Sequence, residues 1–100
     1  MIKNKTELED YLQKLKDDKY LQNAPIKISR VENAIKLFGK KVNVPEYGKG
    51  KIVAIEVFKE YWAEQRYLIE ITENTAKPIL KSMFPDNIMA FWLKDFTIIN

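Results

Sequence analysis

Four lysines flank a tyrosine in the segment from Gly39 to Val53, and this segment offers the clearest chemistry in the chain. The tyrosine is Tyr47, and the lysines are Lys40, Lys41, Lys49 and Lys51. If adjacent strands bring the lysines onto one surface, their ammonium groups can bind phosphates while the tyrosine ring stacks on a base. Lysines also keep the edge of a sheet soluble and unpaired, whatever the protein does. The sequence leaves both interpretations open.

A second set of candidate residues is aromatic: Tyr61, Trp62 and Trp92. Tryptophan and tyrosine concentrate binding energy in protein interfaces, so we expect these side chains to contact a partner. Phe91 and Trp92 are neighbours in a predicted strand, and strand alternation sends them to opposite faces. One of them therefore lies outside the core, against the helices or a partner. An aromatic cage for a methylated lysine is an alternative role for such rings.

Catalytic chemistry is poorly supplied. The chain has no cysteine, which excludes thiolate nucleophiles and thiolate metal ligands. It has no histidine, which removes the usual general base near neutral pH. Glu56 and Glu70 lie on neighbouring predicted strands and could form a general acid–base pair. Pairing with a nearby lysine, or exposure to solvent, is the simpler interpretation. The run from Gly48 to Lys51 lacks the spacing and the following helix of a phosphate-binding loop. We predict no enzyme, no cofactor and no metal site.

The composition is that of one small folded domain. Of 100 residues, 46% are hydrophobic and 31% charged, which is enough apolar material for a core. The net charge of +3 is weak for a dedicated duplex binder, and Arg30 and Arg66 are the only arginines. No apolar run reaches the ~20 residues of a membrane helix, and the first residues do not resemble a signal peptide. We expect a cytoplasmic protein that does not enter a membrane.

Two helices are predicted in the first 38 residues. Thr6 and Glu9 have the form of a capping box, and apolar residues follow at helical spacing: Leu8, Tyr11, Leu12 and Leu15. A helix is expected over about 6–21, ended by the breaker at 23–25. The capping pattern recurs at Ser29, which predicts a second helix over about 29–38. Ile26 and Ile28 leave open a short strand between the helices.

From Gly39 onwards the apolar period changes from helical to β. Strands are predicted at 42–44, 51–58, 67–72, 88–92 and 97–99, with a tight turn at 45–50 and a 3₁₀ turn at 93–96. Residues 73–86 form a longer connection with two prolines. The predicted fold class is α+β: two short N-terminal helices (1–38) packed on a five-stranded SH3-like antiparallel β-barrel (39–100), in a single compact domain.

The segment from Gly39 to Val53 resembles the opening of Tudor-like and CarD-like domains. The resemblance lies in its glycines, alternating valines, proline and aromatic–glycine pair: Gly39, Val42, Val44-Pro45, Tyr47-Gly48, Gly50 and Ile52-Val53. The same barrel is found at the C-terminus of some superfamily 1 DNA helicases, and residues 50–53 are similar to a KOW motif. The resemblance implies a non-catalytic module that docks on RNA polymerase, other proteins or nucleic acid.

We therefore predict a non-catalytic intracellular interaction module that binds a protein of the transcription or DNA-processing machinery. The residues expected to contact this partner are Tyr47, Lys49, Tyr61, Trp62 and Trp92. Nucleic-acid binding through Lys40, Lys41, Lys49 and Lys51 is the alternative function. A phage- or plasmid-type accessory protein that inhibits a host factor is a third. The sequence makes no prediction of oligomeric state, nor of whether the helices join the binding face.

Overall fold

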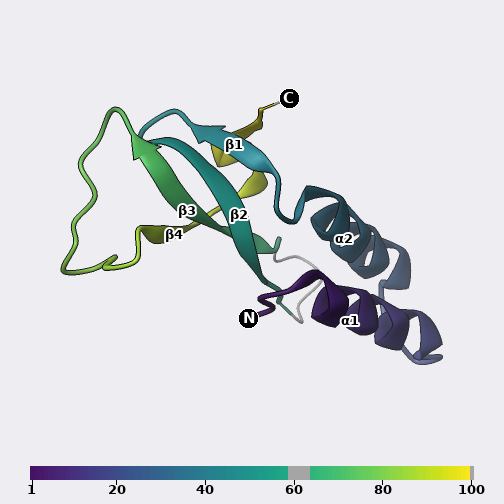
Figure 1. The fold of residues 1–100 in the computed structure, drawn as a ribbon. Coiled ribbons are helices and arrows are strands. Elements are labelled where there is room, and N and C mark those ends of the chain that lie inside the picture. Colours follow the sequence, from purple (N-terminus) through teal and green to yellow (C-terminus); the bar gives the residue numbers. More distant parts are fainter. Residues whose placement is uncertain (59–63, 100) are drawn as a thin grey trace.

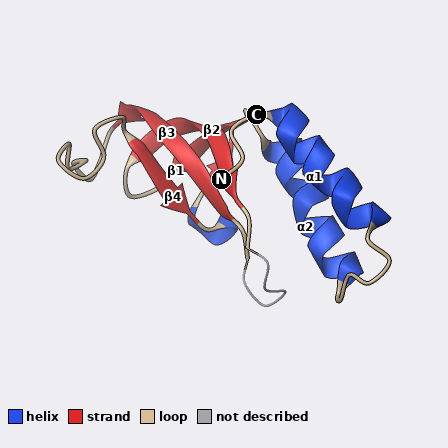
Figure 2. Ribbon diagram, turned by 90° about the horizontal axis from the view of Figure 1, so that it is seen from below, coloured by secondary structure: helices blue, strands red, loops and turns tan. Residues whose placement is uncertain are grey.

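The computed structural model describes residues 1–58 and 64–99. Two helices lie side by side at one end of a five-stranded antiparallel sheet, as Figures 1 and 2 show. The predicted α+β class, with both helices ahead of the strands, is confirmed. Within the described residues, neither helix is long and apolar enough to cross a membrane.

Helix α1 spans Lys5–Asp17, and its N-cap lies two residues earlier than the sequence indicated. The Asn4 Oδ1 atom accepts a hydrogen bond from the Glu7 N–H at 2.8 Å, so Asn4 takes the N-cap position that we expected of Thr6. The helix also ends earlier than residue 21. Asp18 has an extended backbone, and its carboxylate accepts from the Tyr20 N–H at 3.0 Å, a local turn that competes with another helical turn.

Helix α2 spans Ala24–Leu37 and corrects the prediction for residues 23–29. Pro25 lies in the first turn of α2, where its missing N–H is not needed and its fixed φ suits a helix. The break between the helices comes instead from Asn23, whose φ of 57° is left-handed. Ile26 and Ile28 are therefore helical, and the alternative of a short strand there was wrong.

The sheet has the strand order β4-β3-β2-β1-β5, all antiparallel. Its strands are β1 (Lys41–Val44), β2 (Gly48–Glu56), β3 (Arg66–Asn74), β4 (Ile88–Phe91) and β5 (Thr97–Ile98), with the 3₁₀ helix η1 (Leu93–Asp95) before β5. Every predicted strand and the 3₁₀ turn are present, with shifted ends. The sheet is open: in the described chain no pairing joins β4 to β5, so these strands do not close the barrel that the sequence predicted.

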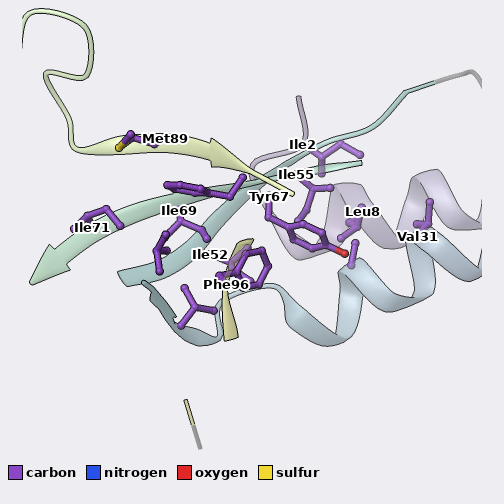
Figure 3. Close-up of a cluster of buried hydrophobic side chains, with 14 residues drawn as sticks. Ile2, Leu8, Val31, Ile52, Ile55, Tyr67, Ile69, Ile71, Met89 and Phe96 are labelled. Carbon is purple, nitrogen blue, oxygen red and sulfur yellow. The ribbon is translucent and has the colours of Figure 1, made fainter. Parts of the chain in front are cut away.

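One face of the sheet, the inner face, is buried, and its core continues into side chains of the helices and of Phe96, which follows η1. Leu8, Val31 and Ala34 from the helices belong to the same buried cluster as Ile55 and Tyr67, as Figure 3 shows for four of them. The N-terminal segment adds to β2 where β1 has ended, because Ile2 and Ile55 exchange two backbone hydrogen bonds of 2.8 Å. The opposite, outer face carries most of the charged side chains of the strands.

A polar contact fixes α2 to β3 inside this apolar seam. The Tyr67 hydroxyl accepts hydrogen bonds from Gln65 Nε2 at 3.0 Å and from Asn33 Nδ2 at 3.5 Å. Gln65 Nε2 also donates to the backbone carbonyl of Arg30 on α2. Burial of Tyr67 removes its hydroxyl from water and raises its pKa, while the two amide donors act in the opposite direction.

A pair of glycine substitutions tests how closely β2 and β3 approach. At Gly48 (φ +133°) an added Cβ would lie 2.1 Å from the Glu73 carbonyl oxygen, whereas at Gly39 (φ +81°) it would meet nothing within 4 Å. We expect Gly39→Ala to cost about 1–2 kcal/mol through backbone strain alone. Gly48→Ala should cost about 3 kcal/mol or more, because the strands must also separate. Urea unfolding measures the free energy of unfolding of both variants, and equal losses of this free energy would contradict the close approach of β2 and β3 at Gly48.

A second prediction concerns Tyr67. Tyr67→Phe should destabilise the protein by about 1–2 kcal/mol at pH 7, because a buried Gln65 N–H loses its acceptor. The folded state holds the Tyr67 proton more tightly than the unfolded state, whose pKa is near 10.0. The stability that Tyr67 adds is therefore complete below pH 10 and is lost as pH rises through the folded pKa. Urea unfolding of both proteins from pH 7 to 11 should show that the difference between their free energies of unfolding narrows above pH 10. A difference that stays constant would contradict this role of the Tyr67 hydroxyl.

Candidate functional site

Three of the four predicted lysines lie on the outer face of the sheet. The register pairs Lys41 of β1 with Lys51 of β2, and Asn43 with Lys49. Strand alternation places Lys41, Lys49 and Lys51 on one face, and all three are exposed. We call them the lysine row. Lys40 precedes β1 and is one residue out of phase with the row.

Carboxylates of β3 lie beside the lysine row. The register sets Glu70 opposite Lys51 and Glu73 opposite Lys49. Side chains directly opposite each other on antiparallel strands are neighbours, and opposite charges there attract. Each lysine of β2 therefore has a glutamate next to it, which offsets much of the positive potential that phosphate binding needs. This arrangement favours the interpretation of the lysines as part of a solvated sheet surface.

Tyr47 does not share the face of the lysine row. Its ring packs edge-on against Phe91, with 5.7 Å between ring centroids, and Phe91 belongs to the buried side of β4. The Lys77 ammonium lies 5.5 Å from the centroid of the Tyr47 ring. The Tyr47 carbonyl accepts hydrogen bonds from Asn74 Nδ2 at 2.7 Å and from the Thr75 N–H at 3.0 Å. Tyr47 thus anchors the first hairpin to the β3–β4 loop, and the geometry gives it no position beside the lysine row for stacking on a base.

The most organised polar cluster on the outer face surrounds Arg66. Arg66 pairs with Glu56 across β2 and β3, with Nη2 at 2.5 Å and Nε at 3.2 Å from Glu56 Oε1. The guanidinium carbon lies 5.8 Å from the centroid of the Phe58 ring and 5.9 Å from that of Trp92. The two rings are themselves 6.4 Å apart. We call Glu56, Phe58, Arg66 and Trp92 the Arg66 cluster.

The Arg66 cluster is accessible as well as ordered. Trp92 is 37% exposed, the next residue, Leu93, is 45% exposed, and the Arg66 side chain is 38% exposed. Phe91, by contrast, is only 9% exposed. The expectation that Phe91 and Trp92 face opposite sides is therefore met, with Phe91 in the core and Trp92 on the surface. Tryptophan and arginine are two of the residue types that most often carry the binding energy of protein interfaces.

The structure separates the two glutamates that we considered as an acid–base pair. Glu56 is held by Arg66, whereas Glu70 lies four residues further along β3 and opposite Lys51. The simpler interpretation, pairing with a cation, holds for Glu56, although its partner is an arginine and not a lysine. Over residues 1–58 and 64–99 no three metal-ligating side chains come together.

Tyr61 and Trp62, which we expected to contact a partner, lie outside the described residues. Arg66 and Phe58 were not among our candidates, although they organise the cluster that Trp92 completes. The sequence contained one usable signal: Arg66 is one of only two arginines, and Tyr67 follows it directly. Its partner could not be chosen without the register of β2 and β3, which places Glu56 opposite it.

Comparison of the chain with protein-family models, with curated proteins and with solved structures finds no match. The function of this chain is therefore inferred from the geometry of its outer face.

A double-mutant cycle tests how firmly Glu56 holds Arg66. From Glu56→Gln, Arg66→Met and the double variant we expect a coupling energy of about 0.5–1 kcal/mol, modest because water screens a pair that is about a third exposed. The coupling should shrink in roughly 1 M salt. The matched control is the pair Glu46 and Lys77, whose nearest charged atoms are 3.9 Å apart and whose side chains are 73% and 61% exposed. Its cycle should give no measurable coupling; equal couplings would contradict a distinct role for the Arg66 cluster.

Proposed function

We propose that this protein is a non-catalytic module that binds a protein partner through the Arg66 cluster and the adjoining Leu93. The observation that carries the proposal is an exposed tryptophan, Trp92, next to an arginine that its surroundings already hold in place. Truncation of tryptophan and arginine side chains causes the largest losses at protein interfaces.

Preorganisation is the physical reason that this surface suits binding. A free arginine loses side-chain entropy when a partner immobilises it, at a cost of about 0.5–1.5 kcal/mol. Arg66 is already restricted in the free protein, because Glu56 holds its head group and two rings flank its guanidinium. It therefore loses less side-chain entropy when a partner binds. Its remaining N–H groups can donate to carbonyls or carboxylates of the partner, while Trp92 and Leu93 supply apolar contact. Lys49 lies on the same outer face and is a candidate for the polar rim of the interface.

We also propose that the sheet is an open form of the SH3-like arrangement. Three observations support this: the strand order β4-β3-β2-β1-β5, the tight first turn, and the 3₁₀ helix between the last two strands. The resemblance of residues 39–53 to Tudor-like and CarD-like domains then motivates the proposed class of partner, a protein of the transcription or DNA-processing machinery. Fold similarity alone does not determine a function, so this class rests on resemblance.

The proposal predicts that Trp92→Ala abolishes capture of the partner. We would immobilise the wild type, Trp92→Ala and Tyr20→Ala, expose each to lysate of the cell that makes the protein, and quantify bound proteins by mass spectrometry. Tyr20 is the matched control, an aromatic residue 91% exposed beyond the end of α1. A specific partner should be lost by at least tenfold with Trp92→Ala and retained with Tyr20→Ala. Retention by both variants would refute binding through the Arg66 cluster.

Nucleic-acid binding through the lysine row is the competing function, and it is tested on the purified protein in solution. Because Glu70 and Glu73 lie beside the lysines of β2, we expect duplex DNA, single-stranded DNA and RNA to bind weakly even at low salt. Fluorescence anisotropy over a salt series measures this. Tight binding that Lys49→Gln with Lys51→Gln weakens, with a shallower salt dependence, would replace the protein-binding proposal.

A further inference from the structure

The two edges of the sheet differ in how well they are protected. Edge strand β5 has only two residues, and short edge strands offer little for another chain to pair with. Edge strand β4 has four residues, Ile88–Phe91, and in the described part of the chain it pairs only with β3. It contains no charged residue, no proline and no register shift, which are the usual features that prevent pairing. Figure 2 shows β4 at the margin of the sheet.

The hydrogen-bond pattern identifies which backbone groups of β4 point away from β3. The Ile71 N–H donates to the Asn87 carbonyl at 2.9 Å, so Asn87 faces β3. Alternation then directs the groups of Met89 and Phe91 towards β3, and those of Ile88 and Ala90 away from it. Across residues 1–58 and 64–99 the N–H and C=O groups of Ile88 and Ala90 have no hydrogen-bond partner. The Ala90 side chain is also exposed.

This free edge has defined ends. Beyond Ala90, the next outward-pointing groups belong to Trp92, and Asp95 satisfies both: its Oδ2 accepts from the Trp92 N–H at 3.0 Å, and its N–H donates to the Trp92 carbonyl at 2.9 Å. Before Ile88, the left-handed Asn87 (φ 59°) turns the chain out of the strand direction. The unsatisfied groups are therefore one N–H and one C=O on each of two residues.

We propose that β4 pairs antiparallel with β4 of a second copy of this chain, with Ile88 of each copy opposite Ala90 of the other. In this register each Ile88–Ala90 pair exchanges two hydrogen bonds, so every free group of both edges is satisfied. Met89 meets its equivalent at the two-fold axis. On the outer face the Ile88 side chain lies beside the exposed Ala90 of the other copy, where a small residue leaves room for it. The contact is self-complementary, as a two-fold interface requires.

The self-complementary pattern of free groups favours a second copy over an unrelated strand, because the same two residues supply both partners of every hydrogen bond. Both ends of the edge carry mixed charges. At the Ile88 end Lys81 contacts Asn87, next to Asp86, and at the other end Asp95 lies beside Lys94 and Glu56 holds Arg66. Two copies in this register therefore bring no large like charges together. This proposal does not depend on the Arg66 cluster binding a partner.

Sedimentation equilibrium and light scattering on the full chain, from roughly 1 µM to 1 mM, test the proposal. We expect a concentration-dependent dimer. Ala90→Lys should lower the affinity of dimerisation by at least tenfold, because two ammonium groups would lie close together near the axis and repel each other. The matched control is Thr97→Lys, which adds the same charge at the exposed position of the β5 edge and should leave the dimer intact.

Amide hydrogen exchange on the wild type gives a second readout that needs no variant. The Ile88 and Ala90 amides should exchange more slowly as concentration rises, while the amides of β5 should not change. A wild type that stays monomeric at about 1 mM overturns the proposal. So does a dimer that survives Ala90→Lys, or one whose Ile88 and Ala90 amides exchange at the monomer rate. If Ala90→Lys fails to fold, the exchange measurement decides alone.

Discussion

The close pairing of β2 with β3 is the constraint on which the rest of the structure depends. These two nine-residue strands are the longest in the sheet; β1 pairs with β2, β4 pairs with β3, and β5 joins the sheet through β1. Their approach requires glycine, since a Cβ at Gly50 would lie 2.4 Å from the Glu70 carbonyl oxygen and 2.8 Å from Ile69 Cγ2. The pairing is not uniform: it shifts register between Lys49 and Gly50 and again between Ile52 and Ala54.

These two register shifts decide which side chains meet on the outer face. A one-residue slip in pairing exchanges the two faces of a strand. Because the shift near Ala54 precedes the end of β2, Ile55 points into the core while Glu56 lies opposite Arg66. The same pairing places Tyr67 on the inner side, where its hydroxyl can reach Asn33 of α2. The register of β2 and β3 therefore determines both the contact of the sheet with the helices and the composition of the Arg66 cluster, although these lie on opposite faces.

This dependence explains what the sequence could and could not predict. The apolar period changes at Gly39, so the order of helices and strands, the 3₁₀ turn, and the opposite faces of Phe91 and Trp92 were predictable from local pattern. Helix ends were misplaced where a single side chain decides them, as Asn4 does for α1, or where Pro25 begins a helix and does not end one. Of the four lysines expected on one surface, three form the lysine row and Lys40 does not, and the glutamate neighbours of the row were not predicted. The pairing of Glu56 with Arg66 depends on the two register shifts between β2 and β3. The residue pattern of these strands does not specify where the shifts occur.

Trp92 belongs to the Arg66 cluster and also marks the end of the free β4 edge, and Asp95 separates these two surfaces. Asp95 occupies the backbone groups of Trp92, so strand pairing stops at Ala90 while the indole remains beside Arg66. In the proposed dimer the two-fold axis stands perpendicular to the joined sheet, so both outer faces look the same way. The two Arg66 clusters would then lie on one continuous surface, on either side of the axis. A partner with two equivalent binding segments could engage both at once, and the second contact would form at high effective concentration. Self-pairing of β4 would in this way add avidity to the binding by each single site.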